Sequence, residues 1–229
     1  MICIIVFILR NLGIVVDYTM PMGMVAIGIG GVSSALRGTI IAVRYKKYST
    51  KKILKDFFAI KQNISSYLLV IVFLFLDFCY VAFDGKLWYI PIILFLKAIL
   101  FGGIEEVGWR YIFQPIMMER HSYISSTLIT FVLWGIWHFA YFYIEGTLLQ
   151  VQAFGFLFGL LTNCFILSAL FIKTNSLWIC VMTHSLINVF SQLAVGGNQN
   201  ITYACKIIII VTVLSIRDQN KKATNVSVL

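Results

Sequence analysis

Long apolar runs alternate with short polar connections along the chain, and within the runs the residues do not alternate with the period of two that marks a β-strand. Runs of about 17 to 25 apolar residues are long enough to cross a bilayer as helices. Because lipid offers the backbone no hydrogen-bond partners, such runs are expected to be helical. The pattern predicts transmembrane spans at 22–43, 64–83, 88–118, 123–143, 151–172, 176–195 and 201–216, and a weaker one at 2–16.

The composition agrees with this pattern. Hydrophobic residues make up 60% of the 229 residues, and charged residues only 12%. A chain of this kind cannot expose so much apolar surface to water, which predicts an integral membrane protein. Since no linker, low-complexity tract or repeat divides the chain, we expect one domain over 1–229, an all-α polytopic transmembrane helical bundle of about eight spans.

Basic residues gather in alternate connections. The positive-inside rule places these connections and the C-terminal tail in the cytoplasm. The net charge of +9 is then explained by topology and by contact with anionic lipid, so no nucleic-acid partner is predicted. The Ile-, Lys- and Asn-rich composition favours a bacterial plasma membrane. The basic residues are Arg44, Lys46, Lys47, Lys51, Lys52, Lys55, Lys61, Arg120, Lys173, Arg217, Lys221 and Lys222.

The cysteines are scattered, without a CxxC pair or a cluster. This spacing predicts free thiols in or near the bilayer and no disulfide framework. The cysteines are Cys3, Cys79, Cys164, Cys180 and Cys205.

Polar side chains recur four residues apart deep inside three apolar runs. Positions four apart share one face of a helix. A charged side chain at bilayer depth costs roughly 2.5 kcal/mol or more, so such residues usually face a polar cavity. The pairs are Glu106 with Arg110, Trp134 with His138, and His184 with Asn188.

The depths of these residues are compatible with a common site. At about 1.5 Å per residue from the expected cytoplasmic ends, Glu105 lies about 21 Å deep, His138 about 22 Å, Asn188 about 18 Å and His184 about 12 Å. The four side chains could therefore meet in one cavity.

The two adjacent glutamates are expected to differ in role. Glu106 can pair with Arg110 along its own helix, which neutralises both charges. Glu105 lies about 100° further round the helix and has no such cation. It is therefore the better candidate for a general base that accepts a proton from water.

Structural interpretations compete with each element taken alone. A membrane histidine often serves as a hydrogen-bonding group between helices. A Glu–Arg pair is equally compatible with a structural clamp or a transport gate, and Trp134 and Trp137 with packing or cavity lining. The joint pattern favours chemistry more than any single element does.

The motifs resemble those of a known family. Glu-Glu-Val-Gly-Trp-Arg at 105–110, followed by Gln-Pro, resembles the EExxxR motif of the CPBP intramembrane proteases, which include CAAX prenyl endopeptidases and bacteriocin-processing or immunity proteins. The segments 133–138 and 184–188 resemble its FxxxH and HxxxN motifs. The resemblance places the protease core at about 88–195. Tyr111, where many members have glycine, and Ala140, where bacterial relatives often have proline, depart from the pattern.

The resemblance implies a role for each matching residue. Glu105 would activate the hydrolytic water, and Glu106 and Arg110 would brace the site. His138, His184 and Asn188 would position the water and stabilise the oxyanion.

The resemblance leaves the use of a metal open. Members are often called metalloproteases, and Glu105, His138 and His184 would be a possible zinc set. A glutamate mechanism without metal is also argued for the family, and this chain lacks an HExxH spacing. We expect no obligatory cofactor, with zinc as the alternative.

The leading hypothesis is a CAAX-type intramembrane endopeptidase. Its substrate would be a membrane-associated or lipidated peptide or protein, such as a bacterial signalling peptide or a bacteriocin precursor. The alternative is a non-catalytic membrane immunity or binding protein that uses the same fold. A small transporter with Glu105 as proton carrier is disfavoured, because the sequence shows no inverted repeat.

Overall fold

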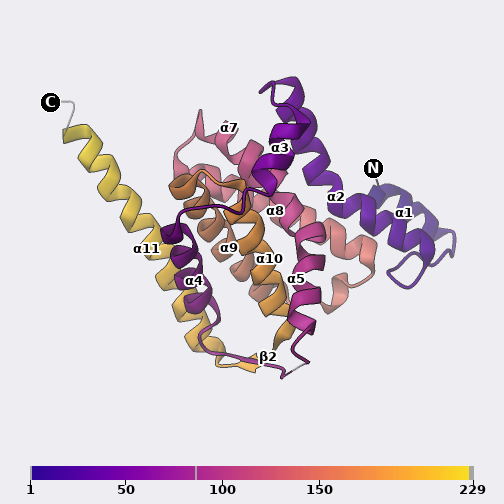
Figure 1. The fold of residues 1–229 in the computed structure, drawn as a ribbon. Helices are drawn as coiled ribbons and strands as arrows, with labels where there is room; N and C mark the ends of the chain where they lie inside the picture. The colour runs from indigo at the N-terminus through magenta and orange to yellow at the C-terminus, as the bar shows by residue number, and fades with distance from the viewer. Residues whose placement is uncertain (1, 86, 227–229) are drawn as a thin grey trace.

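A computed structural model describes residues 2–85 and 87–226, with side chains at 2–85 and 87–215 (Figure 1). Lys86 and the side chains of Arg217, Lys221 and Lys222 lie outside the described residues. Over these residues the chain is a helical bundle with one short antiparallel pair of strands. The longer helices are α1 (Ile2–Asn11), α2 (Pro21–Arg44), α3 (Thr50–Phe57), α4 (Ile64–Phe78), α5 (Ile90–Phe101), α8 (Tyr123–Glu145), α9 (Ala153–Thr174), α10 (Leu177–Leu193) and α11 (Gln199–Val226).

Each of the eight apolar runs contains a helix, and the fold is that of an integral membrane protein. Within the described residues, however, only α2, α8 and α9 are long and apolar enough to cross a bilayer by length and composition. The helices α1, α4, α10 and the part of α11 up to Ser215 are shorter. The ten residues of α1 extend about 15 Å, half of the roughly 30 Å hydrocarbon core. The predicted number of eight spans is not confirmed.

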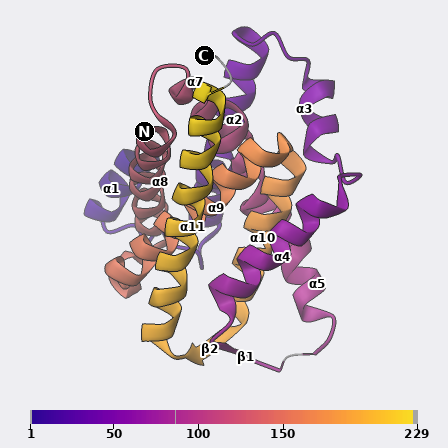
Figure 2. The ribbon, with the colours of Figure 1, turned by 90° about the vertical axis from the view of Figure 1, so that its left-hand side faces the viewer.

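Three of the predicted boundaries are wrong. The run at 2–16 is helical only to Asn11. The runs at 64–83 and 176–195 end as helices at Phe78 and Leu193, because the residues beyond them pair as strands β1 (Val81–Phe83) and β2 (Ala194–Gly197). The two strands are antiparallel and lie at the end of the bundle opposite α3 (Figure 2).

A glycine makes this pairing possible. Gly197 has φ +145°, and a Cβ there would lie 2.3 Å from the Tyr80 carbonyl oxygen. Only glycine tolerates that backbone conformation together with so close an approach.

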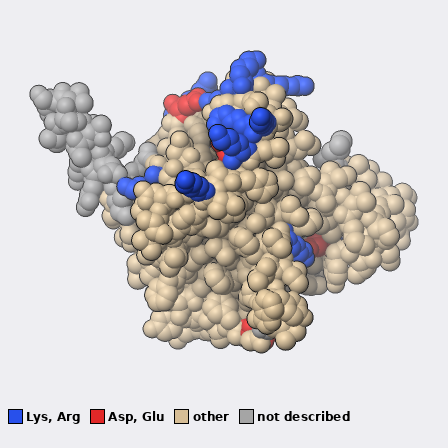
Figure 3. All heavy atoms as spheres, viewed as in Figure 1, with Lys and Arg blue, Asp and Glu red and all other residues tan. Residues whose placement is uncertain are grey.

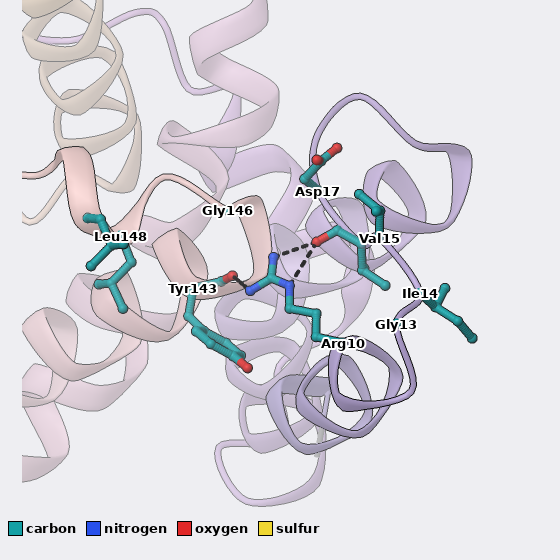
Figure 4. A pocket seen from close by; sticks show the side chains of 10 residues that line it. Arg10, Gly13, Ile14, Val15, Asp17, Tyr143, Gly146 and Leu148 are labelled. Carbon is teal, nitrogen blue, oxygen red and sulfur yellow. Dashed lines mark hydrogen bonds between the residues drawn. The ribbon is translucent and has the colours of Figure 1, made fainter.

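The N-terminal helix is fastened by Arg10, the residue that interrupts the first apolar run. Its guanidinium donates to the carbonyl oxygens of Val16, Tyr143 and Ile144. Figure 4 shows the bond to Tyr143. The guanidinium also lies 4.8 Å above the Tyr143 ring. A positive charge in an apolar run thus serves here to satisfy carbonyl groups at the end of α8 and in the connection that follows α1.

Helix α3 lies in the basic connection after α2, where the apolar pattern predicted no element. Ser49 caps it by accepting from the Lys52 amide, and Ile53 and Phe57 are buried beneath it. Asp56 accepts hydrogen bonds from Lys52 Nζ at 2.7 Å and from the Tyr111 hydroxyl at 2.6 Å. Burial raises the pKa of Asp56, but these two bonds outweigh it and hold that pKa below its usual value.

Helix α10 runs through the middle of the bundle, between α4 and α5 (Figure 1). Its side chains Ile179, Cys180 and Val181 are fully buried. In contrast, Phe75 and Leu96 on the outer helices are 69% and 59% exposed. Large apolar side chains outside and a packed helix inside are what a bundle surrounded by lipid requires.

Helix α2 approaches the short helix α6 (Glu106–Gly108) backbone to backbone. A Cβ at Gly38 would lie 2.6 Å from Gly108 Cα, and one at Gly108 would lie 2.4 Å from the Ser34 carbonyl oxygen. Ser34 and Gly38 are four residues apart, the small-xxx-small spacing that lets membrane helices pack closely. This contact supports the turn that carries the two glutamates.

Gly38→Ala is expected to destabilise the protein by about 1–3 kcal/mol, because the new methyl group overlaps backbone atoms that cannot move aside. Gly28→Ala in the same helix is the matched control: a Cβ there has no atom within 4 Å, and alanine favours a helix by up to about 1 kcal/mol. Thermal unfolding of both variants in detergent checks the contrast. Equal unfolding temperatures would contradict the close packing.

Candidate active site

The segment that carries the two glutamates is not one regular helix. After α5 the chain forms the 3₁₀ turn η1 (Gly103–Glu105), then α6, the π-helical turn η2 (Trp109–Phe113) and α7 (Gln114–Met118). The expectation of a continuous α-helix over 88–118 is therefore corrected. Because π-turns widen a helix and occur frequently at functional sites, this irregularity makes the segment a candidate functional site.

Two glycines let α10 approach this segment. A Cβ at Gly102 would lie 2.2 Å from Asn188 Nδ2, and one at Gly103 would lie 2.7 Å from Ser185 Oγ. The Gly-Gly pair before Glu105 therefore brings α10, with its histidine, against the start of the motif.

Glu106 is the centre of a buried polar cluster. Its Oε1 accepts from Arg110 Nη1 at 3.2 Å and from His184 Nδ1 at 2.8 Å. Glu106 and Arg110 are both fully buried. The predicted intrahelical pair is present, and it extends to a second helix through His184.

This contact fixes the orientation of the His184 ring. An ionised carboxylate can only accept, so Nδ1 of His184 carries the hydrogen when Glu106 is ionised. In the neutral ring Nε2 then offers a lone pair on the side away from Glu106. A carboxylate that orients a histidine in this way is a common arrangement in enzyme sites.

Arg110 has two further partners. Its Nη2 lies 3.4 Å from Cys164 Sγ on α9, and its guanidinium carbon lies 4.2 Å from the centre of the Trp134 ring. Both contacts suit a cation removed from water. Arg110 thus joins η2 to α8 and α9.

Trp134 connects the remaining site residues, a role that the sequence did not reveal. Its indole Nε1 donates to Glu105 Oε2 at 2.8 Å. Its ring centroid lies 5.2 Å from those of His138 and His184, with both pairs edge-on. The spacing of four to His138 was the available signal, but packing was an equally good explanation of a tryptophan there.

His138 lies beside this cluster and, among the contacts of the described residues, makes no hydrogen bond to either glutamate. Its Nδ1 is 2.9 Å from the Trp134 carbonyl oxygen, which can only accept, so Nδ1 carries the hydrogen. Nε2 of the neutral ring is again the free acceptor.

Asn188 lies at the edge of the cluster, one turn of α10 beyond His184 and against Gly102. Its half-buried side chain has no hydrogen bond to Glu105, Glu106 or His184 among the described residues. The structure therefore brings together five side chains, Glu105, Glu106, Arg110, His184 and Trp134, with His138 adjacent and Asn188 further off.

A second polar layer follows one turn after Arg110. Gln114 donates to Ser168 Oγ at 2.6 Å and to Thr127 Oγ1 at 3.2 Å, and Ser168 donates back to Gln114 Oε1 at 2.8 Å. All three residues are buried. This layer holds α7 against α8 and α9 and so fixes the far end of the motif.

The possible zinc set does not meet as a group. Over the described residues, no three or more His, Cys, Asp or Glu side chains are close enough together to hold a metal ion, Glu105, His138 and His184 included. In this arrangement Glu105 is bonded to an indole and His184 to a second carboxylate.

Comparison with known families places this cluster in context. Residues 86–190 match the family model described as type II CAAX prenyl endopeptidase Rce1-like. This match agrees with the resemblance of the three motifs to the CPBP proteases. The matched segment contains every residue of the cluster. No curated protein matches the chain.

Proposed function

We propose that this protein is an intramembrane endopeptidase of the CPBP type in which Glu105 activates water to hydrolyse a peptide bond. The observation that carries the proposal is the difference between two adjacent buried carboxylates. Glu106 is neutralised by Arg110 and bound to His184, whereas Glu105 accepts from the uncharged Trp134 indole. One carboxylate is thus fixed in place, and its neighbour is left to exchange a proton.

The reaction needs a proton to move twice. Glu105 takes a proton from water as the oxygen attacks the scissile carbonyl, which gives a tetrahedral oxyanion. The same carboxyl group then returns the proton to the leaving nitrogen as the C–N bond breaks. Each atom is accounted for without a further reactant.

The histidines are suited to holding the water. The neutral rings of His138 and His184 each present Nε2 as an acceptor, because each Nδ1 hydrogen is already donated. In the proposal one of these nitrogens accepts the second hydrogen of the water. The amide of Asn188 is the donor assigned to the oxyanion, since an ionised carboxylate and a neutral Nε2 cannot donate.

The proposed substrate is a membrane-associated or lipidated peptide or protein, of the CAAX type that the family description names or a bacterial peptide precursor. Two features support this class. The site lies within an apolar bundle whose outer side chains suit lipid, and most Lys and Arg side chains in view lie at the α3 end (Figure 3). We propose that this end is cytoplasmic, in a bacterial plasma membrane.

Cleavage assays on detergent-purified protein test the proposal. A panel of lipidated and precursor peptides is incubated with the protein, with and without chelator, and products are identified by mass spectrometry. Product formation that survives chelation agrees with the mechanism above. Product that is lost with chelator and restored by zinc would replace it with a metal-dependent one.

Trp134→Phe is expected to lower kcat/KM by about 10- to 100-fold, because Glu105 loses a hydrogen bond to its carboxylate while the ring contacts remain. Trp137→Phe is the matched control three residues away, since its indole donates to Ser33 Oγ at 3.1 Å and not to Glu105. Steady-state kinetics on one cleaved peptide compare the two. An equal loss in both variants would show that the effect is one of packing.

A further inference from the structure

Two cysteines meet at the end of the bundle that carries the strands. Cys79 follows the last residue of α4, and Cys205 lies in the second turn of α11. Their Sγ atoms are 3.5 Å apart, although the residues are separated by 126 positions. Both side chains are half-buried, whereas Cys164 and Cys180 are fully buried.

The two thiols are held in this position from both sides. Asp77, two residues before Cys79, forms an ion pair with Lys206, the residue after Cys205. The Asp77 side chain is 1% exposed and that of Lys206 14%, so the pair is shielded from water. It fixes the register of α4 against α11 at the level of the cysteines.

The strands provide a second restraint. Val81 pairs with Gly197 and Ala82 with Gly196, directly after Cys79 and shortly before Cys205. The Asn198 amide also donates to the Tyr80 carbonyl oxygen at 3.3 Å. The contact between the sulfurs is therefore built into the fold and does not depend on the two side chains alone.

We propose that Cys79 and Cys205 are a redox site that forms a reversible disulfide. A disulfide has an S–S length of about 2.05 Å, so the sulfurs must approach by roughly 1.5 Å, a distance within reach of side-chain rotation. The free thiols expected from the sequence are the reduced state of this site.

The oxidant is an external disulfide, carried by a small molecule or by a dithiol oxidase. The thiolate of one cysteine attacks it, releases one thiol and forms a mixed disulfide. The second cysteine then attacks the mixed disulfide and releases the other thiol. The protein loses two hydrogen atoms in total, and the oxidant gains them as two thiols.

The location suits this chemistry. Both strands lie opposite α3, at the end remote from the basic connections (Figure 2). In the orientation proposed above this end is outside the cytoplasm, where disulfides form and persist.

The disulfide would enclose the site in a covalent loop. The chain between residues 79 and 205 contains the whole family segment 86–190 and all the residues of the buried cluster. Cross-linking a loop of this length restricts the unfolded chain strongly. The oxidised protein is expected to unfold about 5 °C or more above the reduced one.

The test uses the full-length protein in detergent, reduced with dithiothreitol and then exchanged into oxidised glutathione. Free thiols are alkylated, and peptides are analysed without reduction. The expected result is a linked Cys79–Cys205 peptide two hydrogen atoms lighter than the separate peptides, together with the higher unfolding temperature. Alkylation of both cysteines, or glutathione left on either one, would overturn the proposal.

Two variants complete the experiment. Cys79→Ser is expected to lose both the linked peptide and the oxidation-dependent rise in unfolding temperature. Cys3→Ser is the matched control, because Cys3 is also half-buried but its sulfur contacts the Ala140 carbonyl oxygen at 3.7 Å. It is expected to keep both. These readouts do not use peptidase activity, so a failure of the disulfide proposal can be distinguished from a failure of the proposed function.

Discussion

Replacing Glu105 with glutamine is expected to lower kcat by about 10²- to 10⁴-fold while the protein stays folded. The amide oxygen of glutamine still accepts from Trp134 Nε1, so the packing around the position is preserved. What is lost is the group that takes the proton from water. Steady-state cleavage of one peptide, with the unfolding temperature measured alongside, separates chemistry from stability.

Glu119→Gln is the matched control for this variant. Glu119 undergoes the same chemical change but lies at the surface, where its side chain is 60% exposed and pairs with Lys46. Its kcat is expected to equal that of the unchanged protein. Cleavage at full rate by Glu105→Gln would remove Glu105 from the mechanism. Binding of a peptide or toxin that persists without any hydrolysis in either protein would favour the immunity-protein interpretation.

Replacing Glu106 with glutamine is expected mainly to destabilise the protein, lowering its free energy of unfolding by about 3–5 kcal/mol. The change leaves Arg110 charged, without exposure to water and without its counterion. It also removes the acceptor charge that orients His184. Chemical unfolding in detergent measures the loss, and activity is expected to fall as well.

A double variant distinguishes an uncompensated charge from a simple packing defect. Glu106→Gln combined with Arg110→Met removes both charges, so much of the lost stability is expected to return. Activity is not expected to return, since His184 remains without its carboxylate. If the double variant were less stable than the single one, the buried pair would not be the reason for the loss.

The sequence predicted the helices of this fold better than their extents. Apolar runs identify what lies in lipid, and every run contains a helix. The predicted helix lengths were wrong where tertiary contacts decide the backbone conformation. Val81 to Phe83 are apolar and continue the run of α4, yet they pair with β2 as a strand. The apolar pattern did not predict helix α3, because only two of its residues are buried and most of the others are polar or charged.

The same limit applies to the candidate site. Spacing along a helix placed Glu106 against Arg110, and the structure has that contact. It could not predict the 3₁₀ and π turns around the pair, because these arise from packing and not from residue type. Contacts between helices, such as His184 with Glu106 and Trp134 with Glu105, require the three-dimensional arrangement.

The segment that matches the family model is smaller than the part of the chain that the buried cluster needs for its support. Gly108, next to the two glutamates, rests on Ser34 and Gly38 of α2, which lie more than forty residues before the matched region begins. A fragment cut at the limits of the match would carry every residue of the buried cluster and lack the surface that supports it. Transplanting the site into another scaffold therefore requires α2 and its small residues to be moved with it.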